Sequence, residues 1–331
     1  MNTTSDTPFQ VHDQRFATII GQAPTIELIA ENQNYPFAHE AGVFFPDTNT
    51  LFITSNRCVS PDGRQKVYIT RVDLSHRPAI CEDICADIPM ANGGINYRKN
   101  HILFCAQGSM TEQSGLYSMS ITVPYETKLL KGDFFGRQFN SVNDMVVHSD
   151  GSIWFTDPIY GFEQGYRPLP SLPNQVYRWC PDTGAIRAMA DGFGKPNGIC
   201  FSPDEKIVYI TDTDRVQGGG AVDDHRVSSI YAFDISTYHG EPFLTGRRLF
   251  AMADQGIPDG IKCDLDGNVY SGCGDGINVW SPGGSLLGRI LIDSGVANFC
   301  FGRDGEIFAL NEHRLWRIKL GARVKGALLG L

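Results

Sequence analysis

Short apolar runs alternate with turn-forming residues along nearly the whole chain, and one pattern recurs six times. Each copy begins with small polar residues, continues with a short apolar run, turns, and ends with a second apolar run. The turns use Gly, Pro and Asp, which favour tight connections between strands. No long segment has helical periodicity, so the pattern predicts strands and little helix. The six copies are HEAGVFFPDTNTLFIT from His39, NGGINYRKNHILFCA from Asn92, SVNDMVVHSDGSIWFTD from Ser141, KPNGICFSPDEKIVYITD from Lys195, IPDGIKCDLDGNVYSGC from Ile257 and GVANFCFGRDGEIFALNE from Gly295.

A third strand follows each copy and carries an aromatic residue at a similar offset. The copies start about 40 to 60 residues apart, the size of a four-stranded propeller blade. We therefore expect an all-β fold, a six-bladed β-propeller of four-stranded blades around a central channel. The alternative is a β-sandwich or two small β domains. The aromatic residues are Tyr68, Tyr117, Tyr177, Tyr231, Trp280 and Trp316.

The N-terminal region provides a strand that can close the ring. Residues 25–29 have the composition of a strand, and we expect them to complete the last blade beside residues 315–320. Closure of this kind protects the sheet edges. The predicted organisation is an N-terminal extension over residues 1–24 and a single propeller domain over residues 25–331.

One residue at the head of each copy carries a side-chain oxygen. The first strand of each propeller blade lines the channel, so these six leading residues should meet at one of its mouths. Each alone is explained as a turn-forming residue at the start of a strand, but six around one axis favour a shared ligand. The leading residues are Glu40, Asn92, Asn143, Asn197, Asp259 and Asn298.

Oxygen ligands from carboxylates and amides are the set that a hard cation requires. Glu40 and Asp259 would neutralise a dication, and Asn143 and Asn197 would add carbonyl oxygens. Ca²⁺ suits such a site better than Mg²⁺, which needs a strict octahedron, and another divalent cation is possible. His39 precedes Glu40, but alternation along a strand predicts that its side chain points away.

Composition narrows the range of partners. The chain has 331 residues and a net charge of −9, which argues against binding nucleic acid. No apolar stretch approaches the roughly 18 residues of a membrane helix, so we expect no membrane partner. The start of the chain lacks a signal sequence, and most of the nine cysteines fall in apolar runs without a CxxC pair. We therefore expect reduced thiols and a cytoplasmic protein.

At the leading residues the chain resembles the senescence-marker-protein/gluconolactonase superfamily, and within it the fungal lactonohydrolases most closely. The resemblance is carried by SVNDMVVHSDGSIWFTDP, KPNGICFSPDEKIVYITD and IPDGIKCDLDGNVY, in this order after a Glu in the first blade. It implies a propeller with Ca²⁺ in the channel and hydrolysis of a small-molecule lactone. By motif it implies that Glu40, Asn143, Asn197 and Asp259 are the metal ligands.

The resemblance also implies how the reaction proceeds. The ion would polarise the lactone carbonyl, and Asp259 would be the catalytic base that activates water. Asp144, in the Asn-Asp pair, matches a position near the substrate and is a second candidate for the base. Binding to Ca²⁺ lowers the pKa of a carboxylate and weakens it as a base, which keeps Asp144 in consideration. Direct attack by Asp259 as a nucleophile is a further alternative.

Two long loops, residues 158–174 and 213–227, should stand over the ion. Ser141 occupies the place where sugar-lactonase members often have Arg, which argues against an aldonolactone. Tyr160, Phe162 and Tyr166 of the first loop suit an apolar or aromatic lactone at least as well as a sugar lactone. Gly218, Gly219 and Gly220 predict a flexible loop rather than a phosphate-binding one. The predicted substrate-binding residues are Asn92, Asn298, Tyr160, Tyr166 and Arg167.

Two other functions fit the same scaffold, because a fold alone does not determine a reaction. One is a hydrolase or biosynthetic enzyme of different selectivity, such as a phosphotriesterase. The other is a binding propeller without catalytic activity, in which the metal would be structural.

Overall fold

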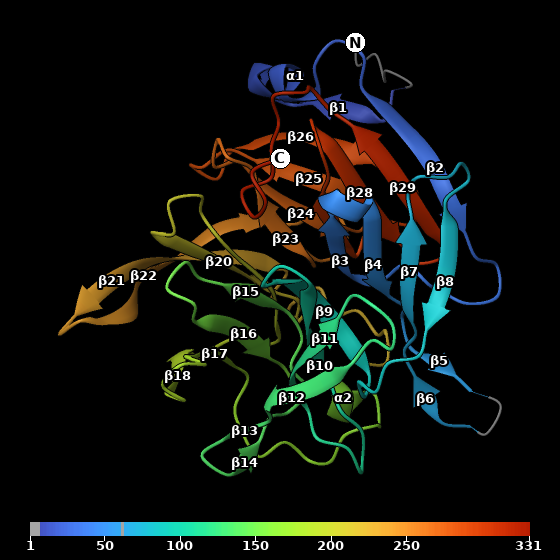
Figure 1. Cartoon of the computed structure of the whole chain (residues 1–331). Coiled ribbons are helices and arrows are strands. Elements are labelled where there is room, and N and C mark those ends of the chain that lie inside the picture. Colours follow the sequence, from blue (N-terminus) through green and yellow to red (C-terminus); the bar gives the residue numbers. More distant parts are fainter. Residues whose placement is uncertain (1–6, 61–62) are drawn as a thin grey trace.

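The computed structural model describes residues 7–60 and 63–331. Over these residues six antiparallel sheets of four or five strands follow one another around a central axis, accompanied by two short two-stranded ribbons (Figure 1). Within each blade, consecutive strands pair as neighbours, as the turn-separated apolar runs predict. The predicted six-bladed β-propeller is confirmed.

The strands of the first three blades have the following bounds. Blade 1 consists of β3 (Glu40–Phe45), β4 (Thr50–Thr54), β7 (Ile69–Asp73) and β8 (Ile80–Ile84). Blade 2 consists of β9 (Ala91–Tyr97), β10 (His101–Ala106), β11 (Gly115–Ser120) and β12 (Thr127–Lys131). Blade 3 consists of β15 (Met145–Val147), β16 (Ile153–Asp157), β17 (Gln175–Trp179) and β18 (Ile186–Ala190).

The other three blades continue the pattern. Blade 4 consists of β19 (Pro196–Phe201), β20 (Ile207–Asp212), β21 (Ser229–Tyr238) and β22 (Glu241–Met252). Blade 5 consists of β23 (Ile261–Cys263), β24 (Val269–Cys273), β25 (Gly276–Trp280), β26 (Leu286–Leu291) and the N-terminal strand β1 (Phe9–Val11). Blade 6 consists of β27 (Asn298–Phe301), β28 (Glu306–Asn311), β29 (Arg314–Lys319) and β2 (Thr25–Glu31). The ribbons are β5 (Cys58–Val59) with β6 (Gln65–Lys66), and β13 (Asp133–Phe134) with β14 (Arg137–Gln138).

The N-terminal strand β2 closes the ring, as predicted. It pairs antiparallel with β29, with Thr25 opposite Lys319 and Glu31 opposite Arg314. The two strands lie side by side in Figure 1 although they come from opposite ends of the chain. Because this pairing covers the outer edge of blade 6, the last blade has four strands like the others.

Residues before β2 also pack on the propeller. Strand β1 extends blade 5 by pairing with β26, and helix α1 (Gln14–Ile20) follows it. Asp13 caps this helix by accepting a hydrogen bond from the backbone N–H of Arg15 at 2.9 Å. Phe16 is fully buried against β26, where a Cβ at Gly288 would lie 2.1 Å from its ring. The boundary between an extension and the propeller domain stays a prediction.

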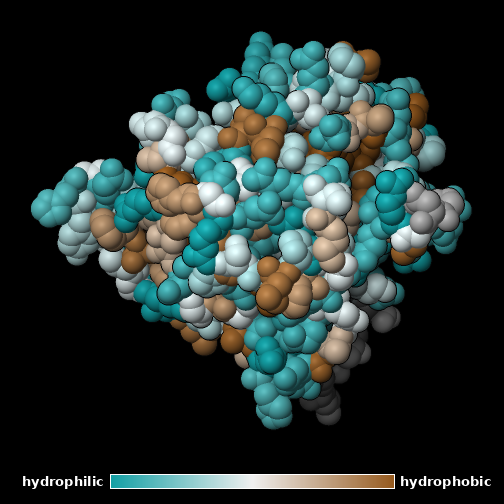
Figure 2. Space-filling view, turned by 90° about the horizontal axis from the view of Figure 1, so that it is seen from below, coloured by the Kyte–Doolittle hydropathy of each residue, from teal (hydrophilic) through white to brown (hydrophobic). Residues whose placement is uncertain are grey.

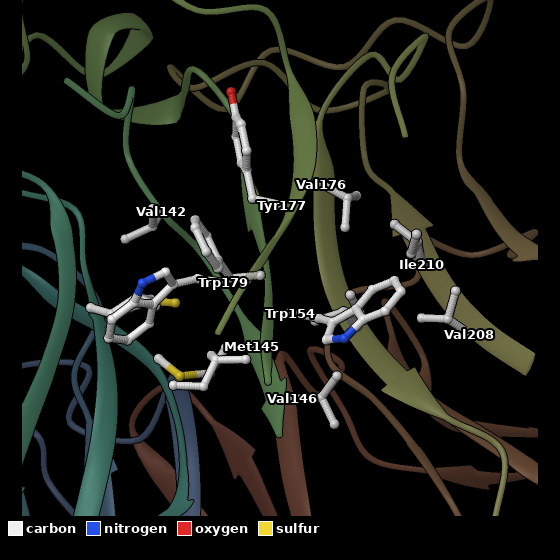
Figure 3. Close-up of a cluster of buried hydrophobic side chains, with 14 of the residues drawn as sticks. Val142, Met145, Val146, Trp154, Val176, Tyr177, Trp179, Val208 and Ile210 are labelled. Atoms are coloured by element: carbon white, nitrogen blue, oxygen red, sulfur yellow. The ribbon is translucent and has the colours of Figure 1, made fainter. Parts of the chain in front are cut away.

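The hydrophobic core lies between neighbouring blades. Among the described residues, clusters of buried apolar side chains connect blades 2, 3 and 4, then 4 and 5, 5 and 6, 6 and 1, and 1 and 2. Figure 3 shows the cluster around blade 3, where Trp154 lies toward Val208 and Ile210 of β20 and Trp179 lies on the other side of the blade. This unbroken series of contacts holds the first strands around the channel.

The outer surface is mixed in character. On the face shown in Figure 2, apolar side chains form scattered patches among hydrophilic ones. Within residues 7–60 and 63–331, no helix combines the length and the apolar character needed to cross a membrane.

The contact of α1 with blade 5 can be tested by mutation. We expect Phe16→Ala to lower the free energy of unfolding by about 3–5 kcal/mol, because it removes a fully buried aromatic ring from the core. Val11→Ala on β1, where the side chain is 48% exposed, is the control and should cost less than about 1 kcal/mol. Chemical denaturation measures both. Equal, small effects would show that the N-terminal segment does not contribute to the propeller.

Candidate metal centre

Five of the six leading residues line one cavity at the mouth of the channel where the first strands begin. The cavity has a volume of about 290 Å³. Three of the five belong to first strands, and the other two lie two residues before β15 and β23. The structure therefore brings together the residues predicted as ligands. The five are Glu40, Asn92, Asn143, Asn197 and Asp259.

A repeated hydrogen bond between blades holds the backbone at these positions. A buried threonine near the end of a second strand donates its hydroxyl to the carbonyl oxygen of the leading residue in the next blade. Each bond ties two blades together at the cavity itself. The three examples are Thr54 to Asn92 at 3.0 Å, Thr156 to Asn197 at 2.7 Å and Thr211 to Asp259 at 3.0 Å.

The aspartate after two of these threonines fixes the loop that leads into the cavity. Its carboxylate accepts hydrogen bonds from two consecutive backbone N–H groups, so the loop conformation is specified by the Thr-Asp pair of the repeat. Asp157 accepts from Asn140 at 3.0 Å and Ser141 at 2.9 Å, and Asp212 accepts from Gly194 at 2.9 Å and Lys195 at 2.8 Å.

Two oxygens at the cavity have no hydrogen-bond partner among the described residues. They are the buried Oδ1 atoms of Asn143 and Asp259. Asn298 donates to Oε2 of Glu40 at 2.6 Å, and the side chain of Asn197 acts to lower the pKa of Asp259. A buried acceptor without a donor costs free energy of folding. These two oxygens could therefore accept a hydrogen bond or bind a cation.

The pKa values of the two carboxylates indicate that little positive charge lies near them. Burial, followed by the charge of Asp259, raises the pKa of Glu40 to about 8. Burial also raises the pKa of Asp259 to about 6, against the opposing effect of His39. No described Lys or Arg forms an ion pair with either carboxylate. Two ionised carboxylates are therefore disfavoured in this cavity unless a cation joins them.

This donor set fits a hard divalent cation. Glu40 and Asp259 supply two charges, and Asn143 supplies a free amide oxygen. Among the described residues no group of three His, Cys, Asp or Glu side chains is arranged to hold a metal ion. A cation held here would need amide oxygens as well as the carboxylates, and such ligands suit Ca²⁺ better than metals that prefer nitrogen or sulfur.

The expectation that His39 points away from the cavity is wrong. His39 lines the cavity, and its Nδ1 lies 2.7 Å from Oε1 of Glu312, whose Oε2 accepts from Asn56 at 3.1 Å. Burial alone would lower the pKa of His39, but Glu312, Glu40 and Asp259 together raise it to about 9. Alternation fails because β3 begins only at Glu40 and bulges at once at Ala41, which has φ 66°.

Asp144 lies outside the lining of this cavity. Its Oδ1 accepts from the backbone N–H of Met145 at 2.8 Å, and its Oδ2 lies 3.9 Å from Nζ of Lys262. Burial raises its pKa, while Lys262 opposes that shift.

Asn298 also lies outside the lining of this cavity. Its side-chain nitrogen donates to Glu40, and its side-chain oxygen accepts from the N–H of Phe299 at 2.8 Å. Asn298 therefore orients Glu40 rather than facing a substrate.

Of the loop residues predicted to bind substrate, Tyr160 lines the cavity and two others do not. Tyr160, in helix α2 (Tyr160–Glu163), pairs its hydroxyl with Thr213 at 2.5 Å. Tyr166 is buried and donates its hydroxyl to Gln107. Arg167 is 3% exposed and donates to four backbone carbonyls, so its guanidinium is fully used in holding the loop. The four carbonyls belong to Phe139, Ser109, Glu112 and Asn140.

A buried lysine joins the two long loops above the cavity. Lys195 is 1% exposed, and its Nζ lies 2.9 Å from Asp214 and 3.3 Å from Glu163. Glu163 in turn accepts from the N–H of Gly218 at 2.7 Å. The glycines at 218–220 line the cavity, so this segment is part of the site rather than a loop apart from it. Sequence reasoning missed Lys195, because its role depends on partners in both loops.

The protein is a six-bladed propeller in which carboxylate and amide oxygens lie together at one mouth of the channel. The sequence profile of the SMP-30/Gluconolactonase/LRE-like region family matches residues 63–308. The chain belongs to this family, and the resemblance found in the repeat motifs is confirmed.

Curated relatives align over most of the chain. Lactonohydrolase oryL of Aspergillus oryzae is 28% identical, with 95% of this chain and 75% of the relative covered. Lactonohydrolase oryH of the same species is 26% identical, with 97% and 80% covered. The gluconolactonase of Zymomonas mobilis is 29% identical over 60% of this chain and 55% of its own length.

Solved structures share the fold. A gluconolactonase from Xanthomonas campestris has a TM-score of 0.76 at 26% identity, with 95% of this chain and 94% of the other covered. The calcium-binding protein regucalcin from Agrobacterium tumefaciens has a TM-score of 0.62 at 16% identity, with 91% and 95% covered, a likeness of fold alone.

The raised carboxyl pKa values predict how stability depends on pH and Ca²⁺. Because the folded pKa of Glu40 lies above its ordinary value, metal-free protein should lose stability as the pH rises from 4.5 to about 8. Ca²⁺ requires the ionised carboxylates, so it should raise the melting temperature more at pH 8 than at pH 5. At 100 times its Kd, the ion should stabilise the protein by about 2.7 kcal/mol.

Thermal unfolding with and without Ca²⁺ measures this effect, with Glu40→Gln as the comparison variant. The variant should lose most of the pH dependence and most of the response to Ca²⁺. Equal stabilisation of both proteins by Ca²⁺ would place the ion elsewhere.

Proposed function

We propose that this protein hydrolyses a lactone with the help of Ca²⁺, or another hard divalent cation, held by Glu40, Asn143, Asn197 and Asp259. The proposal rests on the cavity that these four residues line together. Neither of its two carboxylates forms an ion pair with a Lys or Arg of the described residues, and Oδ1 of Asn143 and Oδ1 of Asp259 have no hydrogen-bond partner there. The relatives named lactonohydrolase, which align over nearly the whole chain, support the choice of reaction.

The cation, when bound, supplies Lewis-acid polarisation of the ring carbonyl. The chain supplies the rest. Asn92 and Tyr160 line the same cavity and are placed to contact the lactone. The threonine hydroxyls described above hold the backbone of Asn92, Asn197 and Asp259 in position at the cavity.

A carboxylate or imidazole must take the proton from the attacking water. Asp259 is our first candidate, because its Oδ1 has no hydrogen-bond partner among the residues that the structure describes. The structure adds His39 as a candidate, since it lines the cavity and Glu312 holds its Nδ1. Its pKa of about 9 means that the imidazole is protonated near neutral pH, so it could act as a base only in its neutral form. Asp144 is the weakest of the three, because it lies outside the cavity lining and its Oδ1 is already bonded to Met145.

The cavity lining favours a hydroxylated substrate. Apart from Tyr160, the aromatic residues that suggested an apolar lactone lie elsewhere, with Phe162 42% exposed and Tyr166 bonded to Gln107. Side-chain amides dominate the lining, and one guanidinium adds to them. Such groups satisfy ring hydroxyls and the ester of a polar lactone better than they accept an apolar ring. These groups are Asn56, Arg57, Asn92, Gln107, Asn143, Gln164, Asn197 and Gln217.

We further propose that the protein acts in the cytoplasm on a small molecule. All nine cysteines are free thiols, which suits a reducing compartment. The net charge of −9 argues against a nucleic-acid partner.

Three variants separate the candidate bases. Asp259→Asn should lower kcat by about 10²- to 10⁴-fold at saturating Ca²⁺, because the amide cannot take a proton. His39→Gln and Asp144→Asn should each lower kcat less than Asp259→Asn does. Metal content and melting temperature, measured for each variant, exclude loss of the ion or of the fold. A loss in His39→Gln or Asp144→Asn equal to that in Asp259→Asn would move the base to that residue.

A substrate panel tests the reaction and its selectivity. The Ca²⁺-loaded enzyme should open glucono-δ-lactone with a higher kcat/KM than dihydrocoumarin, because amides dominate the lining. A chelator should abolish turnover, and added Ca²⁺ should restore it. Hydrolysis of an organophosphate triester in preference to both lactones would contradict the proposal, as would Ca²⁺ binding without turnover of any ester.

A further inference from the structure

A second cavity occupies the opposite end of the channel. It has a volume of about 170 Å³ and is lined by the first strands of all six blades and by residues 326–329 and 331. Apolar side chains dominate its wall, among them Phe44, Met145 and Phe301. A cavity of roughly 150 Å³ is enough to take up benzene. This space therefore suits a small molecule with an apolar body, and it is separate from the candidate metal centre.

One polar group in this cavity remains without a hydrogen bond. Asn96 donates to the carbonyl of Phe44 at 2.9 Å, and Glu205 accepts from the N–H of Ser149 at 2.9 Å. The ammonium of Lys262, by contrast, donates no hydrogen bond to any residue in the described ranges, and this side chain is 15% exposed. A partly buried ammonium with unused hydrogens seeks an acceptor.

The surroundings of Lys262 determine which acceptor fits. Asp144 lies 3.9 Å away, which is too far for a hydrogen bond but close enough to balance the charge of the ammonium. A ligand carboxylate would add a second negative charge beside Asp144. An uncharged carbonyl oxygen would accept from Lys262 without that repulsion.

We propose that this cavity binds an uncharged, mainly apolar molecule with one carbonyl oxygen, which accepts a hydrogen bond from Lys262. The ligand would lie with its apolar body among the side chains of the first strands. The site does not depend on the metal centre or on lactone hydrolysis.

Three probes of similar shape test the proposal by calorimetry on the full-length, Ca²⁺-loaded protein. Acetophenone should bind about tenfold or more tightly than α-methylstyrene, which replaces the carbonyl oxygen with a CH₂ group. Benzoate should bind more weakly than acetophenone. Equal binding of acetophenone and α-methylstyrene, tighter binding of benzoate, or no binding of acetophenone would each overturn the proposal.

Two kinds of variant separate loss of the acceptor contact from loss of the fold. Lys262→Met should reduce the preference for acetophenone over α-methylstyrene to about one, whereas Lys206→Met, at a side chain that is 78% exposed, should leave it unchanged. Val147→Phe, which fills the cavity, should weaken both probes. An unchanged preference in Lys262→Met would overturn the assignment of the lysine.

The cysteines give an independent measure of location. Cys200, Cys263 and Cys300 line the cavity, whereas Cys81 is exposed on β8. Acetophenone should slow maleimide labelling of the three cavity thiols at least threefold and leave the labelling of Cys81 unchanged. Binding of acetophenone without this protection would place it outside the cavity and overturn the proposal.

Discussion

Glu40 and Asp259 share a buried cavity in which burial raises both of their pKa values and the charge of Asp259 further raises that of Glu40. A protein usually avoids such an arrangement, because two buried carboxylates cannot both ionise cheaply without a cation. Closure of the propeller imposes it, since the first strand of every blade meets at the axis. The candidate metal centre is therefore a consequence of the fold combined with the choice of oxygen-bearing residues at the heads of the strands.

Hydrogen bonds between the blades and ion pairs between the two long loops surround this cavity. Hydroxyls from the second strands bind the backbone carbonyls of three leading residues in the neighbouring blades. Above them, Lys195 connects Asp214 in one loop to Glu163 in the other. A buried ammonium that contacts one carboxylate from each loop couples the positions of the two loops.

The fold and the gathering of the leading residues at one cavity were predictable because they follow from repetition. Six copies of one pattern specify six blades, and a propeller brings equivalent positions of its blades together, which is why Glu40 and Asp259 meet although 219 positions separate them. The positions of His39 and Arg167 could not be predicted, because they depend on irregular backbone geometry and on contacts between distant residues. His39 enters the cavity because the chain bulges at Ala41, and its partner Glu312 comes from the last blade. In the sequence, Arg167 is a charged residue within a long loop. In the structure its guanidinium donates to four backbone carbonyls. No periodicity in the sequence indicates such contacts.

Crystallography of the protein grown with Ca²⁺, using anomalous scattering to locate the ion, tests the central claim most directly. The account predicts one ion in the cavity, bound by carboxylate oxygens of Glu40 and Asp259 and by amide oxygens of Asn143 and Asn197. An ion bound at another place, or these four side chains free of any ion at a Ca²⁺ concentration that saturates the enzyme, would contradict it.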